Sequence, residues 1–267
     1  MKRIFSAIGR LAQILPNQCV LCGLKCPAPR PVCMKCFADL PWLISACPQC
    51  RLPLPAGEDQ NPCGQCQSHP PPFDHCYAPF AYAAPVDFLI RGFKDRAQWR
   101  HLTLLAEALG ECLLHSYGDE PWPDYLLPVP LHWRRRLWRG FNQTEVLGHA
   151  LLTHLRQTAQ LRSQSDNTPP DRLLYRALLR TRATQHQRGG SRAHRKHNLS
   201  DAFRLNPTAK ALFQGAHVAI LDDVVTTGST ANETSRLLCR AGASRIDIWA
   251  LARTPLLHER GLDYNSR

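Results

Sequence analysis

The chain has 267 residues and a formal net charge of +12, from 33 Lys and Arg against 21 Asp and Glu. Hydrophobic residues make up 44% of it and charged residues 20%, which excludes a disordered or fibrous protein and allows one full domain with a smaller one. No apolar run reaches the roughly 18 to 20 residues of a membrane-spanning helix, so no membrane span is expected. The basic balance favours anionic partners such as nucleic acid or phosphorylated small molecules.

The first segment, residues 1–72, is rich in Cys and Pro. It opens with a stretch that we interpret as a short amphipathic helix, because Arg10 and Gln13 interrupt its apolar residues and no signal-peptide cleavage site follows. Eight of the twelve cysteines fall into four Cys-x-x-Cys pairs, which in a reducing compartment is metal-ligand spacing, so a cytoplasmic location is expected. The pairs are Cys19 and Cys22, Cys33 and Cys36, Cys47 and Cys50, and Cys63 and Cys66.

Two sets of four thiolates predict two structural zinc ions, since four thiolates bind zinc tetrahedrally. Sequential pairing of the motifs is the preferred arrangement, although an interleaved one fits the same spacing, and disulfides or a single occupied site are the alternatives. A closed four-sulfur site leaves no coordination position for chemistry, so the predicted role of the metal is folding. The other cysteines have no partner at such spacing and are interpreted as small core or surface residues: Cys26, Cys76, Cys112 and Cys239.

The second segment, residues 73–267, is predicted to be an α/β domain whose boundary lies near the three prolines at 70–72. Apolar patterns predict, in chain order, a strand at 77–83, helices at 86–93 and 102–115, a strand at 125–130 and a helix at 143–155. A polar connection over 157–171, a strand at 173–179, a very basic stretch at 180–196 and a return at 203–205 follow. The final strand at 217–221, helix at 230–240 and strand at 246–251 predict a parallel sheet.

The segment Asp-Asp-Val-Val-Thr-Thr-Gly-Ser-Thr, residues 222–230, joins that final strand to its helix. Ligands of open α/β sheets bind beyond the carboxyl ends of the strands, so the position suits a site. Gly228 allows close approach of the backbone, and the amides at the start of the helix can surround a phosphate. Two acids before an anion site suit a sugar phosphate, whose hydroxyls donate to carboxylates. The alternative is a capped helix in which Asp and Thr serve only as turn residues.

Two basic segments accompany this loop. The first, residues 131–143, follows the strand at 125–130, and its arginines are expected to bind the pyrophosphate of the same ligand because guanidinium groups bind phosphate bidentately. The second, residues 180–196, is interpreted as a mobile loop that closes over the site. A solvated basic face and a nucleic-acid contact are the alternatives. Lys94 can also reach the pyrophosphate, and an ordinary solvated lysine is the competing interpretation.

These motifs together resemble the ComF family, which includes the GntX proteins and is similar to type I phosphoribosyltransferases. The resemblance covers residues 19–251, and the glycines at 189 and 190 depart from the apolar residue expected there. It implies an α/β fold with a type I phosphoribosyltransferase-like parallel sheet flanked by helices and a small N-terminal zinc-ribbon module. It also implies that the protein binds phosphoribosyl pyrophosphate (PRPP) with Mg²⁺. The implied contacts are Asp222 and Asp223 with the ribose, Thr226, Thr227, Gly228, Ser229 and Thr230 with the 5-phosphate, Arg134, Arg139 and Lys94 with the pyrophosphate, and Arg180, Arg182, Gln187 and Arg195 in the mobile loop.

Some members of that family are linked to natural competence, so the resemblance implies a PRPP-binding protein that acts in DNA uptake. One alternative is an active Mg²⁺-dependent phosphoribosyltransferase of nucleotide salvage or a related pathway, whose acceptor base the sequence does not name. Another is a non-catalytic protein that binds single-stranded DNA, for which Trp133, Trp138 and Phe141 lie among the arginines. In a third, the zinc module docks a protein partner such as a competence helicase.

Overall fold

The computed structural model describes residues 18–26, 30–131, 140–162, 168–170, 172–181 and 202–255. Its centre is a four-stranded sheet in the order β1-β8-β6-β3, in which every neighbouring pair is parallel. The strands are β1 (His75–Tyr77), β3 (Tyr125–Pro128), β6 (His217–Leu221) and β8 (Arg245–Trp249). The predicted parallel α/β sheet is therefore confirmed.

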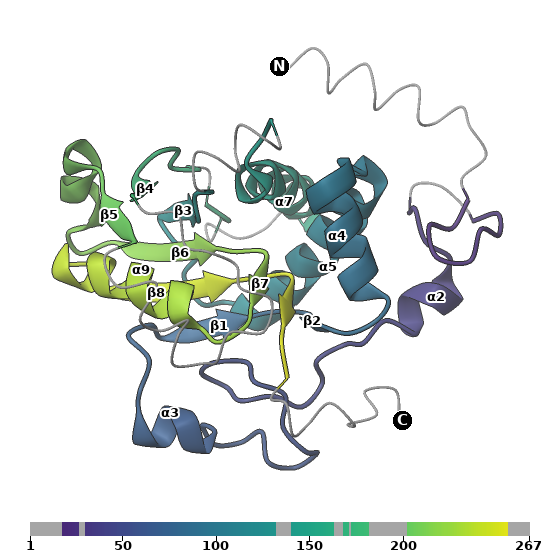
Figure 1. Ribbon diagram of the computed structural model, residues 1–267, viewed down its shortest axis with the longest axis horizontal. Coiled ribbons are helices and arrows are strands. Elements are labelled where there is room, and N and C mark those ends of the chain that lie inside the picture. Colours follow the sequence, from purple (N-terminus) through teal and green to yellow (C-terminus); the bar gives the residue numbers. More distant parts are fainter. Residues whose placement is uncertain are drawn as a thin grey trace.

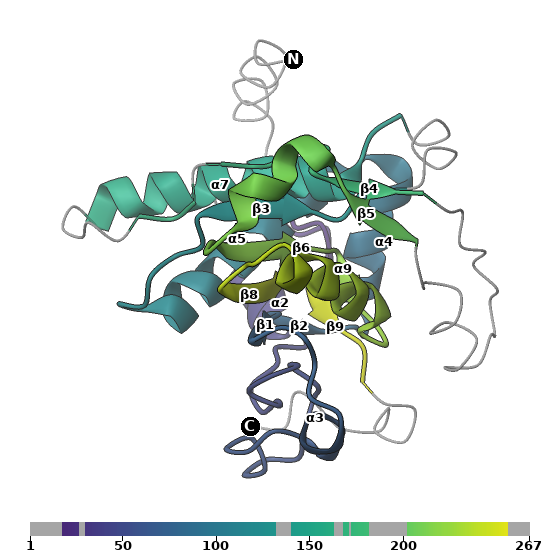
Figure 2. The same cartoon turned by 90° about the vertical axis from the view of Figure 1, so that its left-hand side faces the viewer.

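Helices cover both faces of this sheet (Figures 1 and 2). One core contains Leu126, Leu221 and Trp249, which face the helices α4 (Val86–Arg96), α5 (Trp99–Tyr117) and α7 (Gln143–Arg162). The other core contains the alternate strand residues, among them Ile220 and Ile248, which face α9 (Ser229–Arg240). Because successive side chains of a strand point to opposite faces, a run of consecutive buried apolar residues such as Val218 to Leu221 requires this double cover.

A second, smaller parallel sheet continues the first at its carboxyl end. Its order is β2-β9-β7, and these strands follow β1, β8 and β6 respectively after short breaks in the chain. The strands are β2 (Phe80–Ala81), β7 (Val224–Val225) and β9 (Ala252–Arg253). Because β9 is the middle strand, it lies between the chain that leaves β1 and the chain that leaves β6.

An antiparallel pair stands at the edge of the domain. Strand β4 (Leu178–Arg180) pairs with β5 (Phe203–Leu205), and a 3-10 helix η1 (Pro207–Phe213) leads from β5 toward β6. The backbone N–H of Thr181 donates to the carbonyl of Ala202 at 2.9 Å, so these two residues lie side by side.

The Cys-rich segment contains two short helices, α2 (Met34–Ala38) and α3 (Gly64–Ser68), which lie well apart in Figure 1. The segment packs on the sheet domain, since Trp42 forms an isolated bridge with Phe80, and Leu40 belongs to the same core as the sheet helices. The predicted division into residues 1–72 and 73–267 stays a prediction.

Local predictions and structure differ at three places. The strand predicted over 77–83 is divided into β1 and β2, because the chain bends where the large sheet gives way to the small one. The predicted connection over 157–171 begins later, since α7 continues to Arg162. Of the strand predicted over 173–179, only its end belongs to β4, and Leu173 forms a single bridge with Leu126.

The amphipathic helix predicted near the N-terminus lies outside the described residues. None of the helices within the described ranges is both long and apolar enough to cross a lipid bilayer.

Candidate functional site

The segment 222–230 leaves the carboxyl end of β6, forms the short strand β7 and enters α9 through a tight turn. Gly228 is the N-cap of α9 and has φ +74°, a left-handed conformation that favours glycine. A Cβ at this position would meet no heavy atom within 4 Å, so conformation and not space calls for glycine here. The hydroxyls of Thr227 and Ser229 lie 2.8 Å apart and line the same turn.

This turn presents a row of backbone amides without acceptors. Within the described part of the chain, the N–H groups of Thr226, Thr227, Gly228, Thr230 and Ala231 donate no hydrogen bond. Buried or half-buried amides are normally paired, and successive free amides at a helix N-terminus form an anion site that the helix dipole reinforces. The loop can therefore receive an oxyanion such as a phosphate.

Two carboxylates lie next to these amides. The N–H of Asp222 donates to the carbonyl of Trp249 at 2.9 Å, and the N–H of Asp223 donates to the Asp222 carboxylate at 2.8 Å. The Asp223 carboxylate receives the Nζ of Lys94 at 2.8 Å and the Nε2 of Gln143 at 3.4 Å. The acids are thus held by neighbouring strands and by side chains from α4 and α7.

The surroundings of Asp222 favour its neutral form. Burial, together with the neighbouring Asp223 carboxylate, raises the pKa of Asp222 to about 7, although Lys94 and Arg180 act in the opposite direction. Near neutral pH, Asp222 therefore exchanges between a proton donor and an acceptor. A cation or a set of ligand hydroxyls at this position would favour the ionised form.

Lys94, predicted to reach the pyrophosphate, makes an ion pair with Asp223 in this structure. Gln143 is a site residue that the sequence did not single out, although it ends the basic segment 131–143. This residue is only 3% exposed, and its Oε1 is buried without a hydrogen-bond partner among the described residues. An unpaired buried acceptor beside a carboxylate is costly unless a ligand donates to it. The preceding Asn142 caps α7, since its Oδ1 accepts the N–H of Thr144 at 3.3 Å.

The basic segments are only partly described. Arg134, Arg139, Arg182, Gln187 and Arg195 lie outside the described residues, and so do Trp133 and Trp138.

Arg180 ends β4, stacks over the Phe203 ring at 5.3 Å, and lies near enough to lower the pKa of Asp222. Phe141 packs against Phe93 and Trp99, with ring centroids 6.1 and 6.0 Å away.

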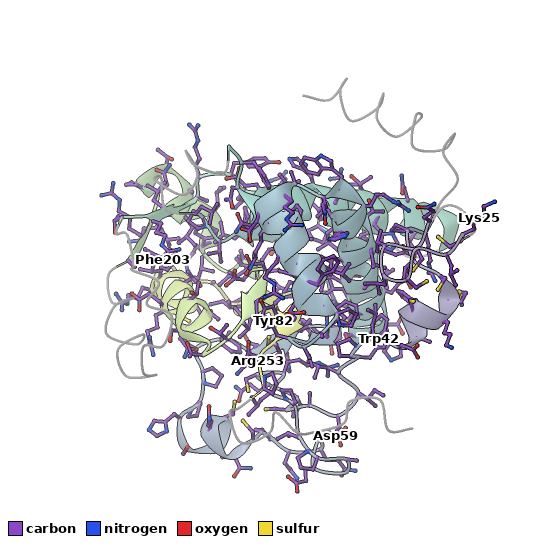
Figure 3. The ribbon with its side chains drawn as sticks, turned by 45° about the vertical axis from the view of Figure 1, so that its right-hand side comes forward. Lys25, Trp42, Asp59, Tyr82, Phe203 and Arg253 are labelled. Atoms are coloured by element: carbon purple, nitrogen blue, oxygen red, sulfur yellow. The ribbon has the colours of Figure 1, made fainter. Side chains whose placement is uncertain are left out.

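The cysteines gather in two sequential sets, as preferred above. Cluster one comprises Cys19, Cys22, Cys33 and Cys36, and cluster two comprises Cys47, Cys50, Cys63 and Cys66. In each, the four sulfurs lie within 4.8 Å of one another. Figure 3 shows the two groups of sulfur atoms, one beside Lys25 and the other beneath Arg253.

The sulfur separations suit a tetrahedral ion. Zn–S bonds of about 2.3 Å place tetrahedral sulfurs about 3.8 Å apart. The measured separations are 3.9 Å for Cys22–Cys33, 3.7 Å for Cys50–Cys63 and 4.0 Å for Cys47–Cys66.

A hydrogen bond from the Cys50 thiol lowers the pKa of Cys47 to about 4, which favours the thiolate form that binds a metal ion. Both clusters can hold zinc.

Arg253, the last residue of β9, connects cluster two with the loop, and no sequence motif indicated it. Its side chain is buried, and its Nε donates to the carbonyl of Cys50 at 3.1 Å. Its Nη1 donates to the carbonyls of Val225 at 3.0 Å, Thr226 and, at 3.2 Å, Thr254.

The sheet and the loop together define a phosphoribosyltransferase-like α/β protein that carries two clusters of four cysteines. Among solved structures, the chain is similar to the glutamine PRPP amidotransferase from B. subtilis, with 15% identity, a TM-score of 0.31, and 55% of this chain and 25% of that one covered. A hypoxanthine-guanine phosphoribosyltransferase from Schistosoma mansoni gives 11% identity and a TM-score of 0.33 over 58% of this chain and 66% of that one. The fold class rests on the order and direction of the strands, not on likenesses of this size.

Sequence relatives are much nearer. The DNA utilization protein YhgH of Escherichia coli (strain K12) is 36% identical over 244 residues, which cover 90% of this chain and 98% of the relative. The competence protein F of Haemophilus influenzae is 34% identical over 193 residues, which cover 72% of this chain and 78% of the relative. No protein-family model matches the chain. The chain belongs to the ComF family, which includes these two proteins.

Proposed function

We propose that this protein binds PRPP with Mg²⁺ at the carboxyl end of its parallel sheet and acts in the use or uptake of DNA. The observation that carries the proposal is a row of five amides over residues 226–231 that have no acceptor among the described residues and lie directly beside two adjacent carboxylates. The amides suit the 5-phosphate, and the carboxylates suit hydroxyls of the ribose. Neither feature alone would select a sugar phosphate.

The neighbouring side chains give this ligand a defined surrounding. Lys94 forms an ion pair with Asp223 in the present arrangement. When ligand hydroxyls donate to Asp223 instead, the Lys94 ammonium can bind a phosphate oxygen. Gln143 contributes an acceptor that a ligand hydroxyl can satisfy. Mg²⁺ would neutralise the charge of the pyrophosphate.

If the protein is also an enzyme, the reaction is displacement of pyrophosphate at the anomeric carbon by a base or amine. Catalysis then consists of orienting the sugar and stabilising the charge of the leaving group, and no protein nucleophile is needed. The acceptor is left open in this proposal.

Calorimetric titration with Mg²⁺-PRPP tests the binding. We expect saturable binding by the wild-type protein and at least a tenfold loss in Asp222→Asn and Asp223→Asn, about the size of one hydrogen bond to a charged group. Asp119→Asn is the matched control, because this exposed acid follows α5 at the opposite end of the sheet. No heat of binding in the wild type, or equal affinity in all four proteins, would rule out the proposal.

The role in DNA use is supported by two relatives, which are named a DNA utilization protein and a competence protein. The net charge of +12 also favours a polyanion. Titration of single-stranded DNA at increasing salt tests a direct contact, since binding through phosphates weakens steeply with salt. Affinity that does not change with salt would exclude a contact of this kind.

A further inference from the structure

Arg253 is a buried cation with an unusual set of partners. The side chain is 4% exposed, and all four carbonyls that it binds belong to the backbone. Within the described ranges, no carboxylate forms a salt bridge with it. A buried guanidinium without a counter-ion is costly, so its partners must hold it firmly.

On the loop side, Arg253 fixes the direction of two peptide groups. In a trans peptide the carbonyl and the N–H of the next residue point in opposite directions. Because the carbonyls of Val225 and Thr226 bind the guanidinium, the N–H groups of Thr226 and Thr227 point away from it. These are the first two free amides of the anion site, so the arginine determines where they point and adds positive charge behind them.

On the other side, the same guanidinium binds a metal-ligand residue of cluster two. Cys50 lies in a turn closed by the bonds from the Arg51 N–H to the Cys47 carbonyl at 2.9 Å and from the Cys47 N–H to the Leu52 carbonyl at 2.8 Å. A tetrahedral ion would lock this turn through the sulfurs of Cys47 and Cys50. The Cys50 carbonyl, which accepts the Arg253 Nε, would then be fixed in place.

In the described part of the chain, no hydrogen bond of this kind joins cluster one to the loop. Cluster one is attached to α5, where Arg30 pairs with Glu107 at 2.5 Å and the guanidinium of Arg100 donates to the Gln18 carbonyl. Figure 3 places Arg253 beside the sulfurs of cluster two and far from Lys25, which lies beside cluster one. The two clusters therefore differ in what they can influence.

From this arrangement we infer that Arg253 is a positioning residue that couples the metal state of cluster two to the phosphate affinity of the loop. With metal bound, Cys50 anchors the arginine, and the arginine orients the amides of the anion site. Without metal, the turn around Cys50 relaxes and the arginine loses one of its anchors. The ligand in this inference is the PRPP of the proposed function, whereas the coupling between cluster and loop does not depend on it.

The decisive variant is Arg253→Lys, because an ammonium is a point donor and cannot span Cys50 and the loop as a planar fork does. We expect both zinc ions to be retained by metal analysis and PRPP affinity to fall about tenfold, as for a lost charged hydrogen bond. Arg51→Lys is the matched control. Arg51 also neighbours Cys50, but its guanidinium binds the carbonyls of Leu43 and Ala78 and not the loop. The PRPP affinity of the Arg51→Lys variant should stay within about twofold of that of the wild type.

A ligand-free measurement separates this inference from the proposed function. Amide exchange by NMR at Thr254 and Asn232 reports on the loop, because these N–H groups donate to the carbonyls of Val225 and Gly228 at 2.9 and 2.8 Å. Exchange should be faster in Arg253→Lys than in Arg51→Lys. Unchanged exchange in Arg253→Lys would overturn the coupling even if PRPP binds. Faster exchange in a protein that never binds PRPP would support the coupling and reject the proposed ligand.

The metal side is tested with one cysteine variant in each cluster. Cys63→Ser in cluster two should accelerate exchange at Thr254 and Asn232, and Cys33→Ser in cluster one should not. In an Arg253→Lys background, Cys63→Ser should have no further effect on the loop, since the connection is already lost. Equal effects of the two cysteine variants would show that metal loss acts through general unfolding, which contradicts the inference.

Discussion

Two carboxylates of the same sheet, the buried Asp247 and the half-buried Asp222, have opposite surroundings. In the middle of β8, the Asp247 carboxylate accepts the Tyr117 hydroxyl at 2.6 Å and the His217 Nε2 at 2.7 Å, and Arg245 lies 3.2 Å away. Burial alone would raise the pKa of Asp247, but these hydrogen bonds hold it below its ordinary value. At the carboxyl end, the pKa of Asp222 is raised to about 7.

Under the proposed function, the difference separates a structural carboxylate from one that meets a ligand. Every partner of Asp247 is provided by the protein, so its charge contributes to folding. Asp222 has no comparable set of hydrogen-bond partners among the described residues. The amides beside it and the Oε1 of Gln143 also lack partners there. Unsatisfied polar groups concentrate at one end of the sheet because a ligand is expected to satisfy them there.

The largest expected effect is the loss of stability when the structural carboxylate Asp247 is removed. Asp247→Ala leaves Tyr117, His217 and Arg245 without their acceptor and should lower the free energy of unfolding by about 3 to 5 kcal/mol. Denaturant titration measures this loss, with Asp119→Asn as the exposed control. The PRPP affinity of the folded protein should not change. A loss below about 1 kcal/mol would contradict the structural role.

The pH dependence of stability should distinguish the two acids. Because the folded-state pKa of Asp222 is raised, the folded protein keeps a proton that the unfolded chain releases between about pH 4 and pH 7. The stability associated with neutral Asp222 is complete below about pH 4 and is lost as the pH rises through about 7. Asp247 contributes in the opposite sense, since its lowered pKa gives stability that is lost as the pH falls.

Denaturant titrations of the wild type and Asp222→Asn at pH 5 and pH 8 isolate the first contribution. The wild type should lose about 2 kcal/mol more than the variant, less than the full pKa difference implies because solvent screens a half-buried group. Changes at the thiolate clusters cancel in the difference between the two proteins. Parallel pH profiles would mean that Asp222 does not titrate in this range.

The variant Gln143→Leu tests whether Gln143 contributes to PRPP binding. The substitution removes the buried unpaired oxygen, so stability should be unchanged or slightly higher, whereas PRPP affinity should fall about tenfold. Gln157→Leu is the matched control on the exposed part of α7. Calorimetry and denaturant titration on both variants provide the test, and equal affinities would remove Gln143 from the site.

The smallest effect concerns the turn itself. Gly228 and Gly215 have nearly the same φ, +74° and +72°, and open space where a Cβ would stand. Alanine at either position should cost about 1 kcal/mol of stability through backbone strain. Only Gly228→Ala should weaken PRPP, by severalfold, because only this glycine belongs to the anion site. Equal binding in both alanine variants would argue against the free amides as phosphate donors.

The sequence was sufficient to predict the features whose functional residues lie close together along the chain. The four Cys-x-x-Cys pairs predicted two four-thiolate sites, and the acids, threonines and glycine of 222–230 predicted an anion turn between a strand and a helix. Each depends on local backbone geometry, so spacing along the chain is sufficient. The apolar residues of 217–221 and 246–251 likewise determined buried parallel strands.

Contacts between residues that are distant in the sequence follow from the fold and could not be predicted from local patterns. Arg253 is 203 positions from Cys50, and Gln143 is 80 positions from Asp223, yet both pairs are joined by hydrogen bonds. The same holds for Lys94 with Asp223 and for the network around Asp247. These contacts follow from the strand order, which places β9 between β2 and β7 and brings α7 to the carboxyl end of β6. No local pattern encodes that order, because it is selected by the burial of both faces of the sheet at once.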